Sequence, residues 1–566
     1  MEKSNSVRGN RRKMELQTRM KTGNNLKWHW IILSIAAILI ILGIVLVTFF
    51  MREKPKELFF KAEANSLQQA LEEWEDLHGD LLTFQKLFSE SPSENDVKID
   101  GKVEIDSAGI HIEEMLKDIS LDFKTKMIPD KSAVYQKADL RLNDVPLIKG
   151  ELVQTDEISA IKIPALYNDY LYVKNNEYGD LIRRFDPDYK GPDQLEVQPF
   201  RLADYVLADD DKTYLKERYK EFLLTQLSDD HFDIEKRVKY QHDDVELSLT
   251  KVTLELTENE TKEFFEKLIN LLEKDDRLHD MVATRYVKFM KSSGSGFKGT
   301  IADITYDEDE MKNKIKQKLR DVKQKVKEIR IKDGLTYTVF IDKNDLVIDR
   351  NISLGIEGSE QLRFEISVKN VPLNNREVHK ETKFEIKPYG DQDKKHKFSA
   401  EFVHTTSKKE KEITGDTDFS IHIQSKNQET ISTDLTVHST YKEENQHEQK
   451  IIYDVTLEVD ESNQPPFKIT GTLAEDRNIN LEEKKLKQRY DGKFDYDGAE
   501  TGPFSLHINM DSNTKLVDQE KAKFPDAEDG INVNALNDEE LYELLTDLEE
   551  NFYRYLTRIS YSLYEF

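Results

Sequence analysis

Few residue groups in this sequence have the spacing that a chemical site needs. Three glycines, Gly294, Gly296 and Gly299, match the G-x-G-x-x-G pattern of dinucleotide sites. That pattern binds a pyrophosphate only where it follows a strand and opens a helix. Here a helical pattern comes before it and strand-like residues come after it. We therefore interpret the Gly/Ser-rich segment at 291–304 as a flexible linker.

Acidic residues beside histidines are the next candidates, as metal ligands. Two runs, Asp229-Asp230-His231 and His242-Asp243-Asp244, combine carboxylates with an imidazole. The run DSNTKLVDQEKA from Asp511 begins like a calcium loop but lacks its Gly at position six and its Glu at position twelve. Among 110 acidic residues such clusters arise by chance. We predict solvated turns, with no metal site and no cofactor.

Catalytic signatures are missing from the sequence. It contains no H-E-x-x-H, no G-x-S-x-G and no phosphate-binding G-x-x-x-x-G-K-[ST]. The absence of cysteine removes disulfides, thiolate metal sites and cysteine nucleophiles. We predict that the protein is not an enzyme and assign no catalytic, cofactor-binding or metal-binding residue. A hydrolase built from scattered carboxylates is the enzymatic alternative.

Charge and composition narrow the classes of partner. The chain has 566 residues and a formal net charge of −27. An acidic body of this kind is repelled by nucleic acid, so no nucleic-acid partner is expected. Apolar residues make up 37% of the chain, enough for a folded protein with a thin core.

One stretch predicts a membrane anchor. Residues 31–50 read IILSIAAILIILGIVLVTFF without a charge, and about 20 apolar residues span the hydrocarbon core of a bilayer. Residues 1–27 carry eight basic and two acidic residues, which predicts a cytoplasmic tail. We therefore expect a transmembrane signal anchor at 28–51 and a C-terminal body outside the cytoplasm. A cleaved signal peptide is the alternative.

The body is predicted to begin with a helix at 58–90 and to continue mainly as strands. From Val97 onward, short runs alternate apolar and polar residues between turns, which is typical of an antiparallel meander. A phase change near Thr250 predicts a β-bulge, and Thr257 with Glu260 forms a capping box that opens a helix. A basic helix follows 307, to lie on a sheet or contact a polyanion.

A second meander runs from Leu335, and a capping box at Asn537 and Glu540 opens a terminal helix. Its apolar residues at helical spacing are expected to face inward. They are Leu541, Leu544, Leu545, Leu548, Phe552, Leu556 and Ile559.

The expected fold class is α+β and rich in antiparallel strands. Two helix–meander–helix units, at 58–290 and 305–566, each form a curved antiparallel sheet with amphipathic helices packed on it. The linker at 291–304 joins them.

Two segments resemble known families. The run GLTYTVFIDKNDLVIDRNISLGI, Gly334–Ile356, is similar to the strand–turn–strand hairpin of bacterial lipoprotein-carrier and lipid-binding lipoprotein domains. That resemblance implies a half-barrel sheet with helices in its concave face and an apolar cavity for acyl chains. KIPALYNDYLYVKNNEYGDLIRRF, Lys162–Phe185, resembles uncharacterised single-pass membrane proteins of Gram-positive bacteria.

These observations together predict a membrane-anchored, extracytoplasmic protein of the bacterial cell envelope. Its partners would be the bilayer, through 28–51, and an apolar, lipid-like ligand or an envelope protein. The alternative is a scaffold or sensor that acts through protein–protein contacts.

Overall fold

A computed structural model gives the fold for most of the chain. It describes residues 54–105, 118–143, 145–189, 193–195, 207–242, 244–292, 307–357, 361–372, 377–388, 397–409, 411–424, 430–444, 447–462, 464–498, 502–519 and 522–564. The predicted tail at 1–27 and anchor at 28–51 lie outside these residues, as do the three glycines at 294–299. Within the described part of the chain, no helix is both long enough and apolar enough to cross a membrane.

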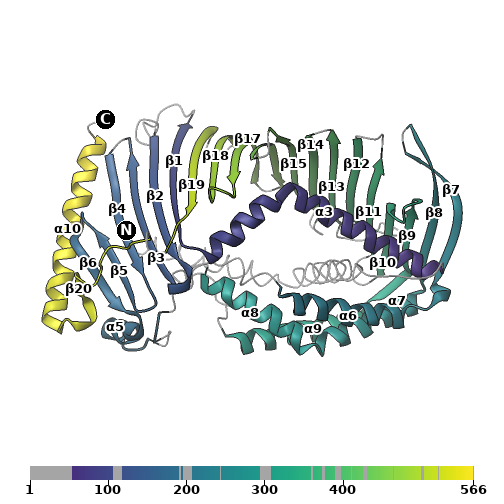
Figure 1. Cartoon of the computed structure of the whole chain (residues 1–566), viewed down its shortest axis with the longest axis horizontal. Helices are drawn as coiled ribbons and strands as arrows, with labels where there is room; N and C mark the ends of the chain where they lie inside the picture. Colours follow the sequence, from purple (N-terminus) through teal and green to yellow (C-terminus); the bar gives the residue numbers. More distant parts are fainter. Residues whose placement is uncertain are drawn as a thin grey trace, which may run out of the picture.

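The strands form one sheet. Strand pairing runs β20, β6, β5, β4, β3, β2, β1, then β19 back through β9 in descending order, and ends with β8 and β7. Every pair is antiparallel except β20 with β6. At about 4.8 Å between neighbours, twenty strands make a sheet roughly 90 Å wide. Figure 1 shows this long curved wall, with the terminal helix at one end.

The N-terminal strands are β1 Ser93–Ile105, β2 Asp118–Ile128, β3 Ala133–Leu142, β4 Val145–Gln154, β5 Ile158–Ile163, β6 Tyr167–Lys174, β7 Phe232–His242 and β8 Val245–Leu256. The central strands are β9 Arg330–Ile341, β10 Val347–Glu357, β11 Gln361–Pro372, β12 Glu377–Pro388, β13 Lys397–Lys409, β14 Glu412–Gln424 and β15 Thr430–Glu443. The last strands are β16 Glu448–Glu461, β17 Gln464–Asn480, β18 Lys485–Gly498, β19 Phe504–Leu516 and β20 Ile531–Asn532.

Helices lie across one face and at the two ends of the sheet (Figure 1). They are α3 Pro55–Glu90, α5 Tyr178–Phe185, α6 Asp209–Gln226, α7 Glu258–Glu273, α8 Asp276–Ser292, α9 Glu308–Glu328 and α10 Asp538–Tyr564. The helix predicted at 58–90 is confirmed as α3. The capping box is confirmed too, because the Thr257 hydroxyl accepts from the Glu260 amide at the start of α7.

The expected division into two sheets is wrong. The first predicted unit is split, with β1–β6 on one flank and β7–β8 on the other, and the strands of the second unit lie between them. The join is made by β1 and β19, where Val97 pairs with Ser512. Apolar alternation defines each strand but not its neighbour in space, and for that reason this long-range pairing was not visible in the sequence. The domain boundaries at 58–290 and 305–566 stay a prediction.

The largest core lies at the β7–β12 end. Helices α3, α6, α7 and α9 cover the sheet there, with Phe59, Leu268 and Val339 almost fully buried between them. A buried ion pair fixes α3 in this core. The Arg350 guanidinium donates to both carboxylate oxygens of Glu63, at 3.2 and 2.9 Å, and the Tyr337 hydroxyl donates to the same carboxylate at 2.7 Å.

Strand β8 shows why its apolar pattern changes phase. Leu249 packs into a small cluster on one face, whereas Val252 and Leu254 enter the main core on the other. The bulge expected near Thr250 exists, but the extra residue is on β7, where Arg237 has φ of +61°. A bulge and several charged side chains on an edge strand disfavour pairing with another chain.

Candidate functional site

A row of apolar side chains crosses the middle of the sheet, one from each successive strand. The members of this apolar row are Phe402, Phe419, Leu435, Leu457, Ile469, Tyr496 and Phe504, on β13 to β19. Each is directly opposite the next in the strand register, so all seven lie on one face. Six intervals of about 4.8 Å make the row roughly 29 Å long.

The apolar row continues out of the main core. Phe402 pairs with Phe384, and Phe384 with Ile366, toward strands that the helices cover. All seven row members are half-buried, although none belongs to a cluster of fully buried residues in the described chain. Side chains of neighbouring strands shield one another in this way where no second layer is packed on the sheet.

Helix α3 crosses the same face at the other end of the strands. The Lys380 ammonium donates to Glu73 of α3, four residues or about 13 Å along β12 from Phe384. Farther on, Phe84 packs against Ile479, ten residues or about 33 Å along β17 from Ile469. The helix therefore diverges from the apolar row, and no cluster of buried residues in the described chain joins the two.

Aromatic rings strengthen one end of the row. The rings of Tyr496 and Phe504 stack with centroids 4.8 Å apart and planes at 21°. Phe467, diagonal to them on β17, stacks on Tyr496 at 5.9 Å. Stacked cross-strand pairs add stability without a covering layer, by roughly 0.2–1 kcal/mol each. Gly471 leaves room for Phe494 beside them, since a Cβ would lie 2.3 Å from that ring.

Polar groups on this face are buried and mutually bonded under α3. The carboxylate of Glu475 accepts from Arg477 at 2.7 and 2.8 Å, from Gln488 at 3.0 Å and from the Tyr490 hydroxyl at 3.1 Å. Burial, and then the nearby Glu475 charge, raise the pKa of Tyr490 to about 12. Because these groups satisfy one another, the network is a fixed structural element beside the apolar row.

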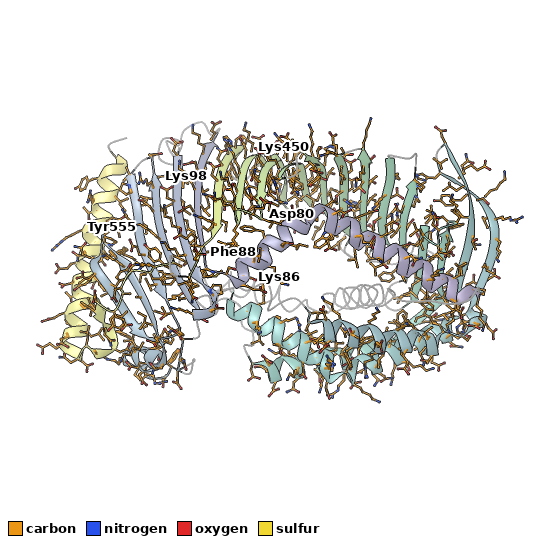
Figure 2. The ribbon with its side chains drawn as sticks, in the orientation of Figure 1. Asp80, Lys86, Phe88, Lys98, Lys450 and Tyr555 are labelled. Carbon is orange, nitrogen blue, oxygen red and sulfur yellow. The ribbon has the colours of Figure 1, made fainter. Side chains whose placement is uncertain are left out.

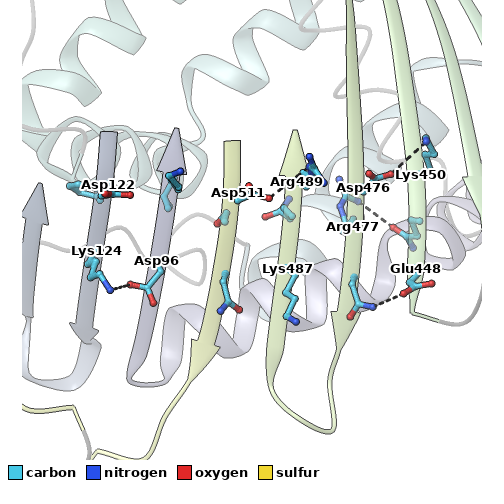
Figure 3. A pocket seen from close by; sticks show the side chains of 18 of the residues that line it. Asp96, Asp122, Lys124, Glu448, Lys450, Asp476, Arg477, Lys487, Arg489 and Asp511 are labelled. Atoms are coloured by element: carbon cyan, nitrogen blue, oxygen red, sulfur yellow. Dashed lines mark hydrogen bonds and ion pairs between the residues drawn. The ribbon is translucent and has the colours of Figure 1, made fainter. Parts of the chain in front are cut away.

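The opposite face is charged. A pocket of about 780 Å³ lies between two lines of side chains on β2, β1 and β19 to β16 (Figure 3). One line alternates in sign across six strands, in the order Asp122, Lys98, Asp511, Arg489, Asp476 and Lys450. Most of the residues that line it carry a charge or an amide, so an acyl chain does not suit it. Exposed cross-strand ion pairs of this kind contribute little stability.

One group resembles a catalytic triad in composition only. The Ser432 hydroxyl lies 2.9 Å from His422 Nδ1 and 2.9 Å from an oxygen of Asp434. A triad needs the serine to donate to the imidazole while the carboxylate orients the other ring nitrogen. Here Asp434 is 3.9 Å from that nitrogen, and the three side chains stand on the polar face of open strands. The sequence did not reveal this group, because His422 is brought beside Ser432 and Asp434 only by the pairing of β14 with β15.

The predicted metal candidates are not brought together. Asp229 pairs with Lys54 at 2.8 Å, and His231 lies 3.4 Å from Glu260. His242 stacks on His379, while position 243 is outside the described residues. Asp511 lies within strand β19 instead of a loop. No set of three or more possible metal ligands occurs in the part of the chain that the structure describes.

The basic helix predicted after 307 is present as α9, and it packs on helices α7 and α8. Helix α9 pairs with α7 through Arg320 and Glu273 at 3.0 Å, and with α8 through Lys312 and Asp280 at 2.7 Å. These basic side chains of α9 therefore form ion pairs with neighbouring helices of the same protein.

Comparison with protein families and with curated proteins found no match. Solved structures that are similar include an outer-membrane protein of Vibrio cholerae, OmpT with loop L8 deleted, at 7% identity and a TM-score of 0.19, covering 75% of this chain and 98% of that one. They also include OccK2 (OpdF) of Pseudomonas aeruginosa, at 5% identity and a TM-score of 0.26, and a BenF-like porin from Pseudomonas fluorescens Pf-5, at 6% and 0.26. Each of these two covers 75% of this chain and 98% of its own.

The structure corrects several sequence-based expectations. The architecture that the resemblance to lipoprotein carriers and single-pass proteins implied is wrong, because one sheet of twenty strands stands in place of two half-barrel sheets. The single-pass, signal-anchored extracytoplasmic protein that holds a ligand is contradicted on the same ground. That the protein has a bilayer partner and is not an enzyme stays a prediction. At TM-scores of 0.19 and 0.26 we infer no shared fold or activity.

Proposed function

We propose that this protein is a non-enzymatic conduit for the hydrocarbon chains of an amphipathic molecule. The chains lie against the apolar row while the polar head stays in water. The observation that carries this proposal is the unbroken line of seven half-buried apolar side chains, none of which belongs to a buried cluster of the described residues.

The dimensions support movement along the row in preference to storage in a cavity. The row is roughly 29 Å long, whereas one leaflet's hydrocarbon is about 15 Å thick, half of a ~30 Å bilayer core. Two acyl chains therefore fit end to end. Each methylene removed from water favours binding by about 0.8 kcal/mol. A uniform apolar surface lets a chain shift along it at little cost, because no position holds it by a directed bond.

The chemistry of the described residues supports a non-enzyme. The buried carboxylate Glu475 accepts hydrogen bonds from Arg477, Gln488 and Tyr490 through its Oε1. The Ser432 group lacks the geometry of a nucleophile and stands on the face opposite the apolar row.

The test is transfer of a fluorescent phospholipid between donor and acceptor vesicles, followed by loss of energy transfer. The key variant is Leu435→Asp, which places a charge in the middle of the apolar row. The matched control is Thr436→Asp, because adjacent strand residues point to opposite faces. We expect Leu435→Asp to lower the transfer rate at least tenfold and Thr436→Asp to leave it unchanged.

A second variant separates function from folding. Leu435→Thr introduces a polar residue that still favours strands, and it is expected to slow transfer while circular dichroism stays unchanged. The charge of Leu435→Asp interrupts the apolar row in its middle and leaves the two ends of the row apolar. This variant should therefore still bind lipid. Equal transfer by Leu435→Asp and Thr436→Asp would refute the conduit.

A further inference from the structure

The C-terminal helix touches the sheet along only one side. Asn551 donates to the Leu166 carbonyl at 3.0 Å, and the Tyr555 hydroxyl donates to the Leu147 carbonyl of β4. These contacts are four residues apart, so they mark a single line along α10. Figure 2 labels Tyr555 on α10, beside strand β4.

Apolar side chains that helical spacing predicts to face inward are exposed on α10. Leu541 and Leu544 are buried as expected, but Leu545, Phe552 and Leu556 are 43–45% exposed. Tyr553 and Tyr561 are exposed further, at 61% and 70%. The expectation of an inward stripe is therefore wrong for Leu545, Phe552 and Leu556, whereas Leu548 and Ile559 are half-buried.

The exposed aromatics surround half of the helix. At 100° per residue, Phe552 and Tyr561, nine residues apart, lie on opposite sides, and Tyr553 lies between them. A partner helix covers a narrow seam about two residues wide per heptad. A fluid apolar interface, in contrast, can receive side chains over half the circumference.

Charge changes sign along the same helix. Its first half carries seven acidic residues, namely Asp538, Glu539, Glu540, Glu543, Asp547, Glu549 and Glu550. Residues 551–564 carry none, but hold Arg554 and Arg558 among the aromatics. Tyr and Phe with Arg are the residues that favour the headgroup region of a bilayer. In a chain of net charge −27, this acid-free half can approach anionic headgroups without repulsion.

We propose that residues 551–561 of α10 dock on a bilayer surface that contains anionic lipid. Phe552, Tyr553 and Leu556 enter the boundary between headgroups and acyl chains, and Arg554 and Arg558 pair with lipid phosphates. The neighbouring strand supplies Ile148, 50% exposed beside the carbonyl that Tyr555 binds. The docking does not depend on the conduit and is tested without lipid transfer.

The absence of cysteine provides a local probe in the full-length protein. Ser560→Cys places a single thiol four residues after Leu556, on the same side of α10, for an environment-sensitive dye. Ser462→Cys, in the exposed turn after β16, is the control position. Vesicles of phosphatidylcholine, with or without phosphatidylglycerol, are then added. We expect a blue shift at position 560 with phosphatidylglycerol and none at position 462.

Two further variants test the side chains. Leu556→Asp, in the Ser560→Cys background, is expected to weaken vesicle binding at least tenfold with an unchanged circular dichroism spectrum. Arg554→Gln with Arg558→Gln is expected to remove the preference for phosphatidylglycerol. An unshifted dye at position 560 in the presence of vesicles would overturn the proposal. So would a blue shift that grows with protein concentration in their absence, since that result means a second copy covers the helix.

Discussion

Replacing Leu457 with alanine tests whether the apolar row is uncovered. Leu457 lies directly opposite Leu435 on one neighbouring strand and Ile469 on the other, and it is half-buried. A cross-strand contact of this kind contributes roughly 0.2–1 kcal/mol, so the free energy of unfolding should fall by about 1 kcal/mol. The matched control is Leu268→Ala in α7, where the side chain is 1% exposed inside the main core. There the same truncation should cost about 2–5 kcal/mol.

The assay is urea unfolding followed by circular dichroism, with wild type and both variants measured together. Thiol labelling gives an independent reading, because the chain has no native cysteine. Leu457→Cys should react with a polar maleimide in the native state, and Leu268→Cys should not. Equal losses of about 3 kcal/mol in the two alanine variants, together with an unreactive Leu457→Cys, would mean that another layer covers the row.

Three further predictions concern the scaffold. Arg350→Ala should lower stability by about 3 kcal/mol, because Glu63 remains buried without its cation; Glu63→Gln with Arg350→Met should recover part of that loss in the same urea titration. A hydrogen bond from Lys369 holds the pKa of Glu381 below its usual 4.5. The Glu381 carboxylate therefore contributes stability above pH 4.5, and this contribution is lost as the pH falls through the lower pKa of the folded state. In thermal unfolding across this pH range, Glu381→Gln should lose less stability on acidification than wild type. Gly334→Ala should cost more than about 1 kcal/mol in melting experiments, since φ is +72° and a Cβ would meet the Leu256 carbonyl.

Local structure was accessible from the sequence. The alternation of Leu335, Tyr337, Val339 and Ile341 predicted β9, and the hairpin to β10 follows at Asp342, whose carboxylate accepts from the Leu346 amide. The capping box at Asn537 is also confirmed, as Glu540 donates its amide to the asparagine side chain at 3.0 Å. These features depend on residues close together in the chain, whose patterns have direct physical causes.

The arrangement of the strands was not accessible. Pairing of β1 with β19 closes a separation of about 400 residues, and nothing in either strand's alternation names its partner. As a result, two separate sheets seemed sufficient to bury the apolar faces. The observed sheet buries its largest apolar cluster at the β7–β12 end, where Phe59 and Leu268 are enclosed, and smaller clusters elsewhere.

The candidate site was accessible only in part. Alternation along the second meander predicted that each strand has an apolar face, but it equates an apolar face with a buried one. Whether a helix lies on that face depends on the path of α3, which is fixed by distant contacts such as Glu63 with Arg350. The same limit explains Leu545 and Leu556 on α10, where helical spacing showed amphipathicity but not what covers it.

The most direct test of the conduit is photocrosslinking with a fatty acid that carries a diazirine in its acyl chain. The full-length protein is irradiated with the probe, digested and mapped by mass spectrometry. The account predicts adducts on the apolar row, at Phe419, Leu435, Leu457 and Ile469, and fewer adducts there when Leu435→Asp interrupts it. Adducts confined to the charged face, or spread without preference over both faces of β14 to β17, would contradict it.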